Sequence, residues 1–390
     1  MQRVMSKATI AKLIRILASG PTKVLVFLFS RFGGLRIIDP LLSTLSDRYG
    51  LFLTYDATKL DSNPINFSSR EASDILKIQL SPQSENFKAK FEHKTLELNN
   101  PFGSKLAIIL QGAIVHKNDF TLRIVKRYLK TFRGAVVILS TWDNEDTSAF
   151  LSLTCPNSFK IVKSSKPEIT GVSNFNLQLI STLAGLEIAQ GSNCEFVLKT
   201  RTDQAMMNPE ALQHIHFVFH KYPGNNGNGR IVVASRNTFL YRLYGISDMF
   251  LFGSLVEMQK FWHVPQDLRI RESKQLSTNS TQVTLRSYSK EELVEVYLVA
   301  NYLRKKNLEP KFTLEDSIEA YRDHFIILDS GTLGLIWNKY TRNANRWSKE
   351  FVPNPHYEVT FLDWLKMQDC IDQYLEYEEI IDMDLRTFQD

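Results

Sequence analysis

The sequence predicts an α/β protein built around a mostly parallel sheet. Continuous apolar runs of strand length, such as 106–110 and 135–139, alternate with longer segments of helical period, such as 120–132 and 174–189. A strand covered by helices on both faces is apolar throughout, so an unbroken apolar run indicates a buried parallel strand. Strand, helix and strand in this rhythm are typical of βαβ units.

Composition places the chain among ordinary globular proteins and excludes several classes. Its 390 residues are 43% apolar and 23% charged, which excludes a disordered or collagen-like chain and allows two or three domains. Three cysteines without a CxxC pair argue against a disulfide scaffold or a cysteine zinc site, and this usage suits a reducing cytosol. Neither GxxxxGK[ST] nor GxGxxG occurs, which argues against P-loop and dinucleotide-binding enzymes. Basic residues are not interleaved with aromatics over a long face, so no nucleic-acid partner is expected.

The two ends of the chain carry opposite charge. Residues 1–38 hold seven basic residues and no acidic one, with apolar residues between them and the apolar run 24–29. Such a segment predicts either a helix at a membrane surface or a basic helical arm packed on its own core. The run 24–29 is far shorter than the ~20 residues needed to span a bilayer. Residues 361–390 hold nine acidic and two basic residues, which predicts a solvated helix face that attracts the arm.

The elements follow in order. Residues 39–103 are polar with turn signals, and 1–103 are expected to form a basic helical extension with a small subdomain. Residues 104–350 form the main domain, and 351–390 form an acidic tail or helix. Further strands are predicted at 159–162, 196–199, 231–234, 248–252 and 325–328. Further helices are predicted at 145–153, 214–222 and 256–262, followed by a surface loop at 271–289. Ser289 and Glu292 have the spacing of a capping box that opens a helix to about Lys306.

Polar residues follow two of the buried strands, where ligands bind in open α/β sheets. Gln111 and Gly112 end the first strand, and the glycine would let backbone approach a nucleotide unless it only makes a turn. Arg201 and Asp203 follow the strand 196–199. Asp203 has the oxygen ligands that Mg²⁺ or Mn²⁺ prefers, and Arg201 has the planar fork that pairs with phosphate. The alternative is a salt bridge between these two side chains.

The start of the helix 174–189 completes a longer pattern. It reads N-x-N-x-Q-x-x-S-T-x-x-G-L-x-x-A and is followed by a strand and L-K-T-R-T-D at 198–203. This block resembles the WavE-type lipopolysaccharide-synthesis family, whose members are implicated as glycosyltransferases. Further matches lie at 140–142, 247–253, 295–298 and 339–340, so the resemblance spans about 105–340. It implies a GT-A-like fold, in which a Rossmann-like sheet binds a nucleotide-sugar and an acceptor half follows.

The resemblance also implies a donor site. Gln111, Gly112, Asn176 and Gln178 would line the nucleotide pocket, although capping of the helix by Asn174 is the simpler explanation for its amide-rich start. The family fold has a D-x-D metal motif after the central strand, and here Arg201 replaces its first carboxylate. Either Asp203 alone anchors a Mg²⁺ or Mn²⁺ ion, or Arg201 neutralises the diphosphate directly. His324, beside a late strand, is the second candidate metal ligand.

An inverting transfer also needs a base for the acceptor hydroxyl. Glu295 matches the family's E-x-Y-L and ranks first, Glu292 ranks second because of its capping position, and Asp248 would contact the acceptor. The expected reaction moves a sugar from a nucleotide-sugar to a bacterial surface glycan, lipopolysaccharide core or capsule. It would take place at the cytoplasmic face of the inner membrane, where residues 1–38 bind. One alternative function is the transfer of a phosphoryl-linked group onto a glycan. The other is a non-catalytic scaffold with a degenerate site, which the replacement of the first motif carboxylate by Arg201 would explain.

Overall fold

The structure is a computed structural model that describes residues 51–55, 76–80, 100–153, 158–224, 229–269, 284–337 and 357–384. The basic arm 1–38 and the family positions 339–340 lie outside these ranges, and so do residues 271–283 of the predicted loop 271–289, whose last residues, 285–289, are helical and not a loop. The chain divides into two compact units, one of Met1–Glu92 with Ala344–Phe351, and one of His93–Asn343 with Val352–Asp390. In the first unit, β1 (Leu51–Tyr55) and β2 (Leu76–Leu80) pair antiparallel.

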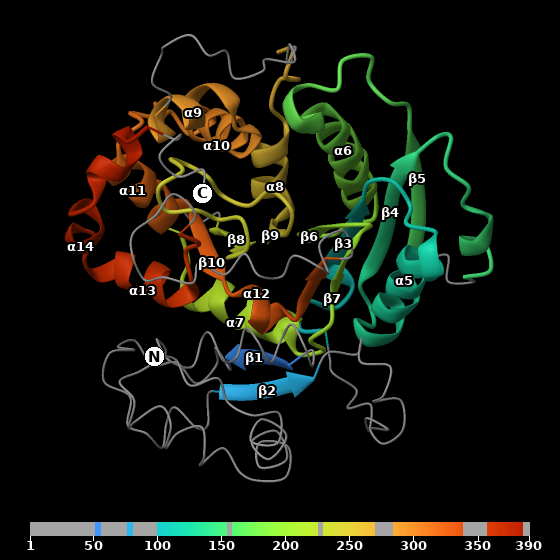
Figure 1. The fold of residues 1–390 in the computed structure, drawn as a ribbon. Helices are drawn as coiled ribbons and strands as arrows, with labels where there is room; N and C mark the ends of the chain where they lie inside the picture. Colours follow the sequence, from blue (N-terminus) through green and yellow to red (C-terminus); the bar gives the residue numbers. More distant parts are fainter. Residues whose placement is uncertain are drawn as a thin grey trace, which may run out of the picture. The chain divides into compact units, whose positions relative to one another are not determined.

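The second unit is built on a seven-stranded sheet of order β10-β8-β9-β6-β3-β4-β5 (Figure 1). Its strands are β3 (Leu106–Gln111), β4 (Val136–Trp142), β5 (Phe159–Ser164), β6 (Phe196–Arg201), β8 (Ile231–Ala234), β9 (Leu251–Ser254) and β10 (Phe325–Leu328). Neighbouring strands are parallel, except that β9 runs antiparallel to both β6 and β8. Strands β3, β4, β8 and β10 are buried along their whole length, as their apolar runs predict. The predicted α/β class with a mostly parallel sheet is confirmed.

Helices cover both faces of the sheet (Figure 1). On one face lie α6 (Phe175–Gly191) and α8 (Leu255–Trp262), and on the other lie α5 (Phe120–Thr131) and α7 (Ala211–Lys221). Helix α6 packs so closely on β3 that a side chain at Gly185 would not fit: a Cβ there would lie only 2.6 Å from Ile109 Cγ2. On the other face of the sheet, which α5 and α7 cover, the aromatic rings of Phe102, Phe196, Phe219 and Phe252 pack against one another. The predicted helix at 145–153 is reduced to a single 3₁₀ turn, Ser148–Phe150.

A second, two-stranded sheet lies beside the carboxyl end of β6. It pairs β7 (Gln204–Met206) antiparallel with β11 (Leu335–Trp337), and Gln204 faces Trp337 in the register. The short helix α12 (Ser330–Leu333) connects β10 to β11. Neither strand was predicted, since three residues carry too little periodicity to be recognised. The pairing brings Trp337 next to the segment that follows β6.

The predicted helix from 289 to 306 is in fact two helices. Helix α9 (Leu285–Glu292) ends at Leu293, whose extended backbone (φ −88°, ψ 129°) separates it from α10 (Val294–Lys305). The capping box consists of Thr284 and Ser287, whose hydroxyls each accept from the other's backbone N–H. The predicted box at Ser289 is therefore wrong, because Ser289 lies inside α9 and is buried.

The acidic end of the chain is not a freely solvated helix. Helix α13 (Phe361–Asp369) packs on α11 (Leu314–His324) and β10, and α14 (Asp372–Leu375) follows it. Trp364 is fully buried, and its indole N–H donates to the Tyr321 carbonyl at 3.2 Å. The buried face of α13 thus closes the core, which corrects the expectation drawn from net charge alone.

Candidate functional site

The strand order defines a topological switch point between β3 and β6. The chain runs from β3 to β4 and β5 on one side, then returns to place β6 on the other side of β3. At the carboxyl ends of these two strands, Gln111 is paired with Arg201. Ligands of open α/β sheets bind outside the carboxyl ends at such a point, because the two connections leave in opposite directions there. The structure therefore places two of the predicted site residues side by side at the expected position.

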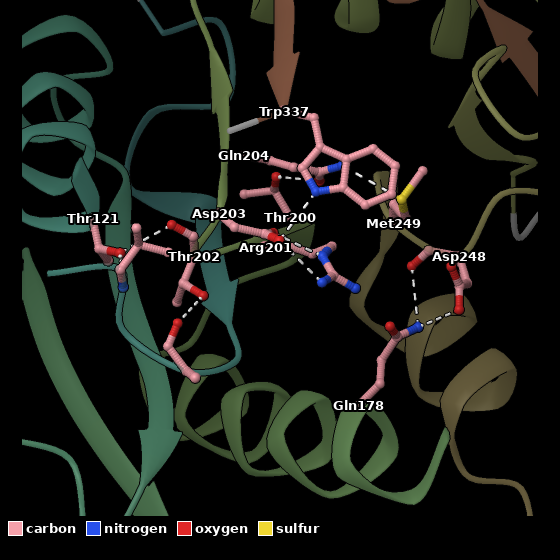
Figure 2. Close-up of polar contacts among 12 residues, drawn as sticks. Thr121, Gln178, Thr200, Arg201, Thr202, Asp203, Gln204, Asp248, Met249 and Trp337 are labelled. Carbon is pink, nitrogen blue, oxygen red and sulfur yellow. Dashed lines mark hydrogen bonds and ion pairs between the residues drawn. The ribbon is translucent and has the colours of Figure 1, made fainter. Parts of the chain in front are cut away.

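The reversed strand β9 brings a third predicted residue to the same edge. Because β9 is antiparallel to β6, the residues that precede it, including Asp248, lie beside the carboxyl end of β6. Gln178 reaches from the first turns of α6, and its Nε2 donates to Asp248 Oδ2 at 2.5 Å (Figure 2). The predicted residues Gln178, Arg201, Asp203 and Asp248 are thus gathered at one edge of the sheet.

Arg201 and Asp203 form a fixed pair under Trp337. The guanidinium of Arg201 donates to both carboxylate oxygens of Asp203, from Nε at 2.8 Å and from Nη2 at 3.2 Å. The Trp337 indole N–H donates to Asp203 Oδ2 at 3.0 Å, and the guanidinium carbon lies 5.7 Å from the ring centroid (Figure 2). Burial acts to raise the pKa of Asp203, but the hydrogen bonds and charge of Arg201, together with hydrogen bonds from Trp337 and a backbone N–H, outweigh it and lower the pKa. The salt bridge between Arg201 and Asp203, which was the alternative interpretation of this pair, is therefore present, and it fixes the orientation of the Arg201 guanidinium.

These residues do not fit a resident divalent cation. Both oxygens of Asp203 already accept from fixed donors, and the guanidinium beside it repels a cation. Within the described ranges, no three His, Cys, Asp or Glu side chains gather so as to hold a metal ion. The remaining candidate ligand is far away, because His324 directly precedes β10 and so lies at the amino edge of the parallel strands, while Asp203 follows β6 at the carboxyl edge. One ion cannot bind both residues.

His324 belongs instead to a buried cluster at the amino edge. Its ring packs edge-on against Tyr302, and burial, helped by the charge of Lys306, lowers its pKa to about 4. In the same cluster, the buried Glu257 carboxylate accepts from the Lys306 ammonium and the Tyr302 hydroxyl, each at 2.5 Å. This arrangement ties α8 to α10 and accounts for His324 as a neutral packing residue.

Gln111 offers an unused acceptor at the switch point. Its side chain is only 5% exposed, and its Oε1 has no hydrogen-bond partner within the described part of the chain. Leaving a buried carbonyl unpaired costs about 1–3 kcal/mol, so a ligand N–H or O–H that reaches it is strongly favoured. Gly112 follows with φ +119°, and a Cβ there would sit 3.2 Å from Thr202 Oγ1, so the tight turn after β3 requires glycine.

Asn176 has a different role from the one that the resemblance implied. It is fully buried, and its Nδ2 donates to the carbonyls of Ile169 and Asp267, both at 2.8 Å. Its Oδ1 accepts from the Asp267 N–H at 2.8 Å. All polar atoms of the amide are therefore taken by backbone, and Asn176 fixes the loops around the start of α6 without reaching a ligand.

Glu295 is the second residue of α10 and is half-buried. Burial raises its pKa to about 7, the Asp248 carboxylate acts in the same direction, and a backbone N–H and Arg242 act against them. The nearby charge of Asp248 thus adds to burial in disfavouring ionisation of Glu295, which keeps its proton up to near neutral pH. Glu292 is the last residue of α9, and its side chain lies outside the described part of the structure.

Sequence reasoning missed three residues of this edge. Lys199 is fully buried in β6. A lysine within an otherwise apolar strand could have been recognised from the sequence as a candidate functional residue. Trp337 and Arg242 gave no signal, because the three-residue strand β11 and the irregular segment before β9 have no recognisable period. Both are placed by long-range packing.

The fold and this edge define an α/β protein with cationic, amide and acidic groups at a switch point, as in enzymes that bind anionic small molecules. Residues 106–379 match the family model described as WavE lipopolysaccharide synthesis, well over half of the chain, and the chain belongs to this family. Its role therefore lies in lipopolysaccharide synthesis, which points to a biosynthetic enzyme. No curated protein matches the sequence significantly. Among the helices that the structure describes, none is both long and apolar enough to cross a bilayer.

Proposed function

We propose that the chain is a GT-A-like glycosyltransferase that moves a sugar from a nucleotide-sugar to a bacterial surface glycan, either lipopolysaccharide core or capsule. The observation that carries the proposal is that Arg201 and Gln111 are register partners at the switch point, where Gln178 also holds the Asp248 carboxylate. The order of the first four strands, 3-2-1-4, is that of a Rossmann-like sheet and supports a donor half there. The strands β8, β9 and β10 would then form the acceptor half.

Donor binding would rest on Arg201 and not on a metal ion. A guanidinium held by Asp203 and Trp337 presents its planar fork in one orientation, which suits the oxygens of a diphosphate. The leaving nucleoside diphosphate gains negative charge as the sugar–oxygen bond breaks, and a preorganised cation stabilises that charge. Gln111 would accept a hydrogen bond from the nucleoside through its unpaired Oε1.

Glu295 would act as the base of an inverting displacement. Its carboxylate takes the proton of the acceptor hydroxyl while that oxygen attacks the anomeric carbon and the diphosphate leaves from the other face. A pKa of about 7 suits this role, since a base near the working pH is both available and strong enough to accept the proton. Asp248, held by Gln178, would bind the acceptor hydroxyls.

The domain limits and the location of the reaction belong to the same proposal. Residues 104–350 would form the catalytic domain, whose core is completed by helix α13 of the segment 351–390, and residues 1–38 would hold it at the cytoplasmic face of the inner membrane. The seven basic residues of the arm support this location, because anionic head groups attract each one by about 1 kcal/mol.

A panel of nucleotide-sugars tests the proposal by thermal shift, with Mn²⁺ and with EDTA. A true donor at 100 times its dissociation constant stabilises the folded state by about 2.7 kcal/mol. We expect one donor to raise the melting temperature equally in both conditions, and turnover to release a nucleoside diphosphate. Release of a monophosphate would instead indicate transfer of a phosphoryl-linked group. Binding without turnover on any acceptor glycan would indicate a scaffold, and no binding at all would refute the assignment.

A further inference from the structure

Lys199 is a lysine without any contact to solvent in the middle of the sheet. It lies in β6 between Ile109 of β3 and Leu251 of β9, and its side chain is 0% exposed. Its register partner Ile109 faces α6, so the ammonium lies on the same face as the helices α6 and α8. An ionised amine in such a place is costly, and an apolar side chain of similar volume often serves stability as well or better. Stability alone therefore gives no reason for a lysine here.

The contacts of the ammonium lead to one residue of the candidate site. Lys199 Nζ donates to the main-chain carbonyl of Asp248 at 2.5 Å, and it lies 4.7 Å from the ring centroid of Trp262. The side chain of Asp248 is held separately, by Gln178 Nε2 at 2.5 Å from Oδ2. One cation from β6 thus fixes the backbone of Asp248, and one amide from α6 fixes its carboxylate.

We propose that Lys199 is a positioning residue that holds the backbone of Asp248 at the carboxyl edge and thereby fixes where the Asp248 carboxylate stands in the candidate site. The kinetic part of this inference rests on the proposed glycosyl transfer, whereas the geometric part does not. Lys199 touches neither the acceptor nor the donor in this view. It acts through Asp248, whose charge adds to the effect of burial in raising the pKa of Glu295.

The electrostatics of the cluster agree with this arrangement. Burial lowers the pKa of Lys199 to about 7, Asp248 and Asp203 act to raise it, and Arg201 acts to lower it. Burial has the largest effect on the pKa of Glu295 and raises it; the Asp248 charge raises it further, and a backbone N–H and the Arg242 charge lower it. Lys199 is not among these groups, so its replacement should reach Glu295 only through a movement of Asp248.

The test compares Lys199→Met with Lys160→Met in the full-length protein. Methionine keeps the volume and removes the charge and the hydrogen bond. Lys160 is a matched control, because it is a half-buried lysine of the same sheet whose ammonium donates to Ser192 Oγ at 2.7 Å, far along the sheet in β5. The main readout is the titration of the Glu295 carboxyl by ¹³C NMR of labelled glutamate, with the signal assigned from Glu295→Gln.

We expect Lys199→Met to fold with an unchanged or higher melting temperature and to lower the titration midpoint of Glu295 by about one unit, because Asp248 moves away. Turnover should fall roughly 10²-fold with an unchanged KM for the donor, the size expected for a misplaced reacting group. Lys160→Met should change neither quantity. If Lys199→Met does not fold, Lys199→Gln, which keeps a shorter donor, should give a smaller shift in the same direction.

An unchanged Glu295 midpoint in a folded Lys199 variant would overturn the inference. Failure of the proposed function looks different, since the protein would then bind no nucleotide-sugar while the Glu295 midpoint still moved. A shift of equal size in Lys160→Met would show a general loosening of the sheet and would also overturn the specific role.

Discussion

Replacing Glu295 by glutamine should stabilise the protein while it stops catalysis. The pKa of Glu295 is raised from 4.5 to about 7, so the folded state binds a proton that the unfolded state has released between these values. Stability is therefore lost as pH rises from about 4.5 to about 7, and it stays low above that range. With 1.36 kcal/mol per unit, this difference in pKa lowers the free energy of unfolding by about 3 kcal/mol at pH 8 and by about 1 kcal/mol at pH 5. Glutamine has the same shape and carries no charge, so it removes this penalty.

Urea unfolding of the wild type and of Glu295→Gln, at pH 5 and at pH 8, measures the effect directly. The variant should be more stable at both values, with an advantage about 2 kcal/mol larger at pH 8. Its turnover should fall about 10²–10⁴-fold with donor binding retained. An advantage that is equal at the two pH values would show that Glu295 ionises normally, and the reasoning would fail. Near-normal turnover would refute its role as the base even if the stability result held.

Four further results are expected. Asp203→Asn should lower transfer by at least about 10²-fold with an unchanged far-UV CD spectrum, since the charge that orients Arg201 is lost; near-normal turnover would contradict this. Arg201→Lys keeps the charge but loses the fork, so donor affinity measured by calorimetry should drop about tenfold or more. Thr284→Ala should cost about 1 kcal/mol in urea unfolding, whereas Glu292→Gln, outside the observed cap, should change stability by less than about 0.5 kcal/mol. Protein that starts at Asp39 should stay in the supernatant with anionic vesicles that pellet the full chain at low salt, and equal sedimentation would exclude the arm as the anchor.

Much of the fold was predictable because the sheet is buried on both faces. Burial of this kind forces unbroken apolar runs, and the strands β8 and β10 fall at the predicted residues 231–234 and 325–328. The prediction failed where structure depends on distant partners. Strands β7 and β11 exist only as a pair joined across the chain, and α13 was hidden by the acidic charge around its apolar stripe.

The candidate site was predictable only for those residues that come directly after a buried strand. Gln111, Arg201 and Asp203 come directly after buried strands, so their shared edge follows from topology. Asn176 could not be assigned correctly, because its three hydrogen bonds to Ile169 and Asp267 depend on loops without a sequence pattern. His324 could not be assigned for the same reason. The direction of β10 places His324 at the amino edge of the sheet, and the sequence does not reveal that direction.

The reversal of β9 has a consequence for how members of this family can diverge. A parallel crossover must carry the chain back to the opposite edge, but the connection from β8 to β9 begins and ends at the carboxyl edge. Residues 235–250, which include Arg242 and Asp248, therefore leave the sheet and return to it at the edge that holds the candidate site, while Tyr244 in their middle contacts α11. Insertions or exchanges in this connection would alter the surroundings of Asp248 without shifting the register of any parallel strand. Changes in this segment can therefore alter the site edge while the common sheet is kept.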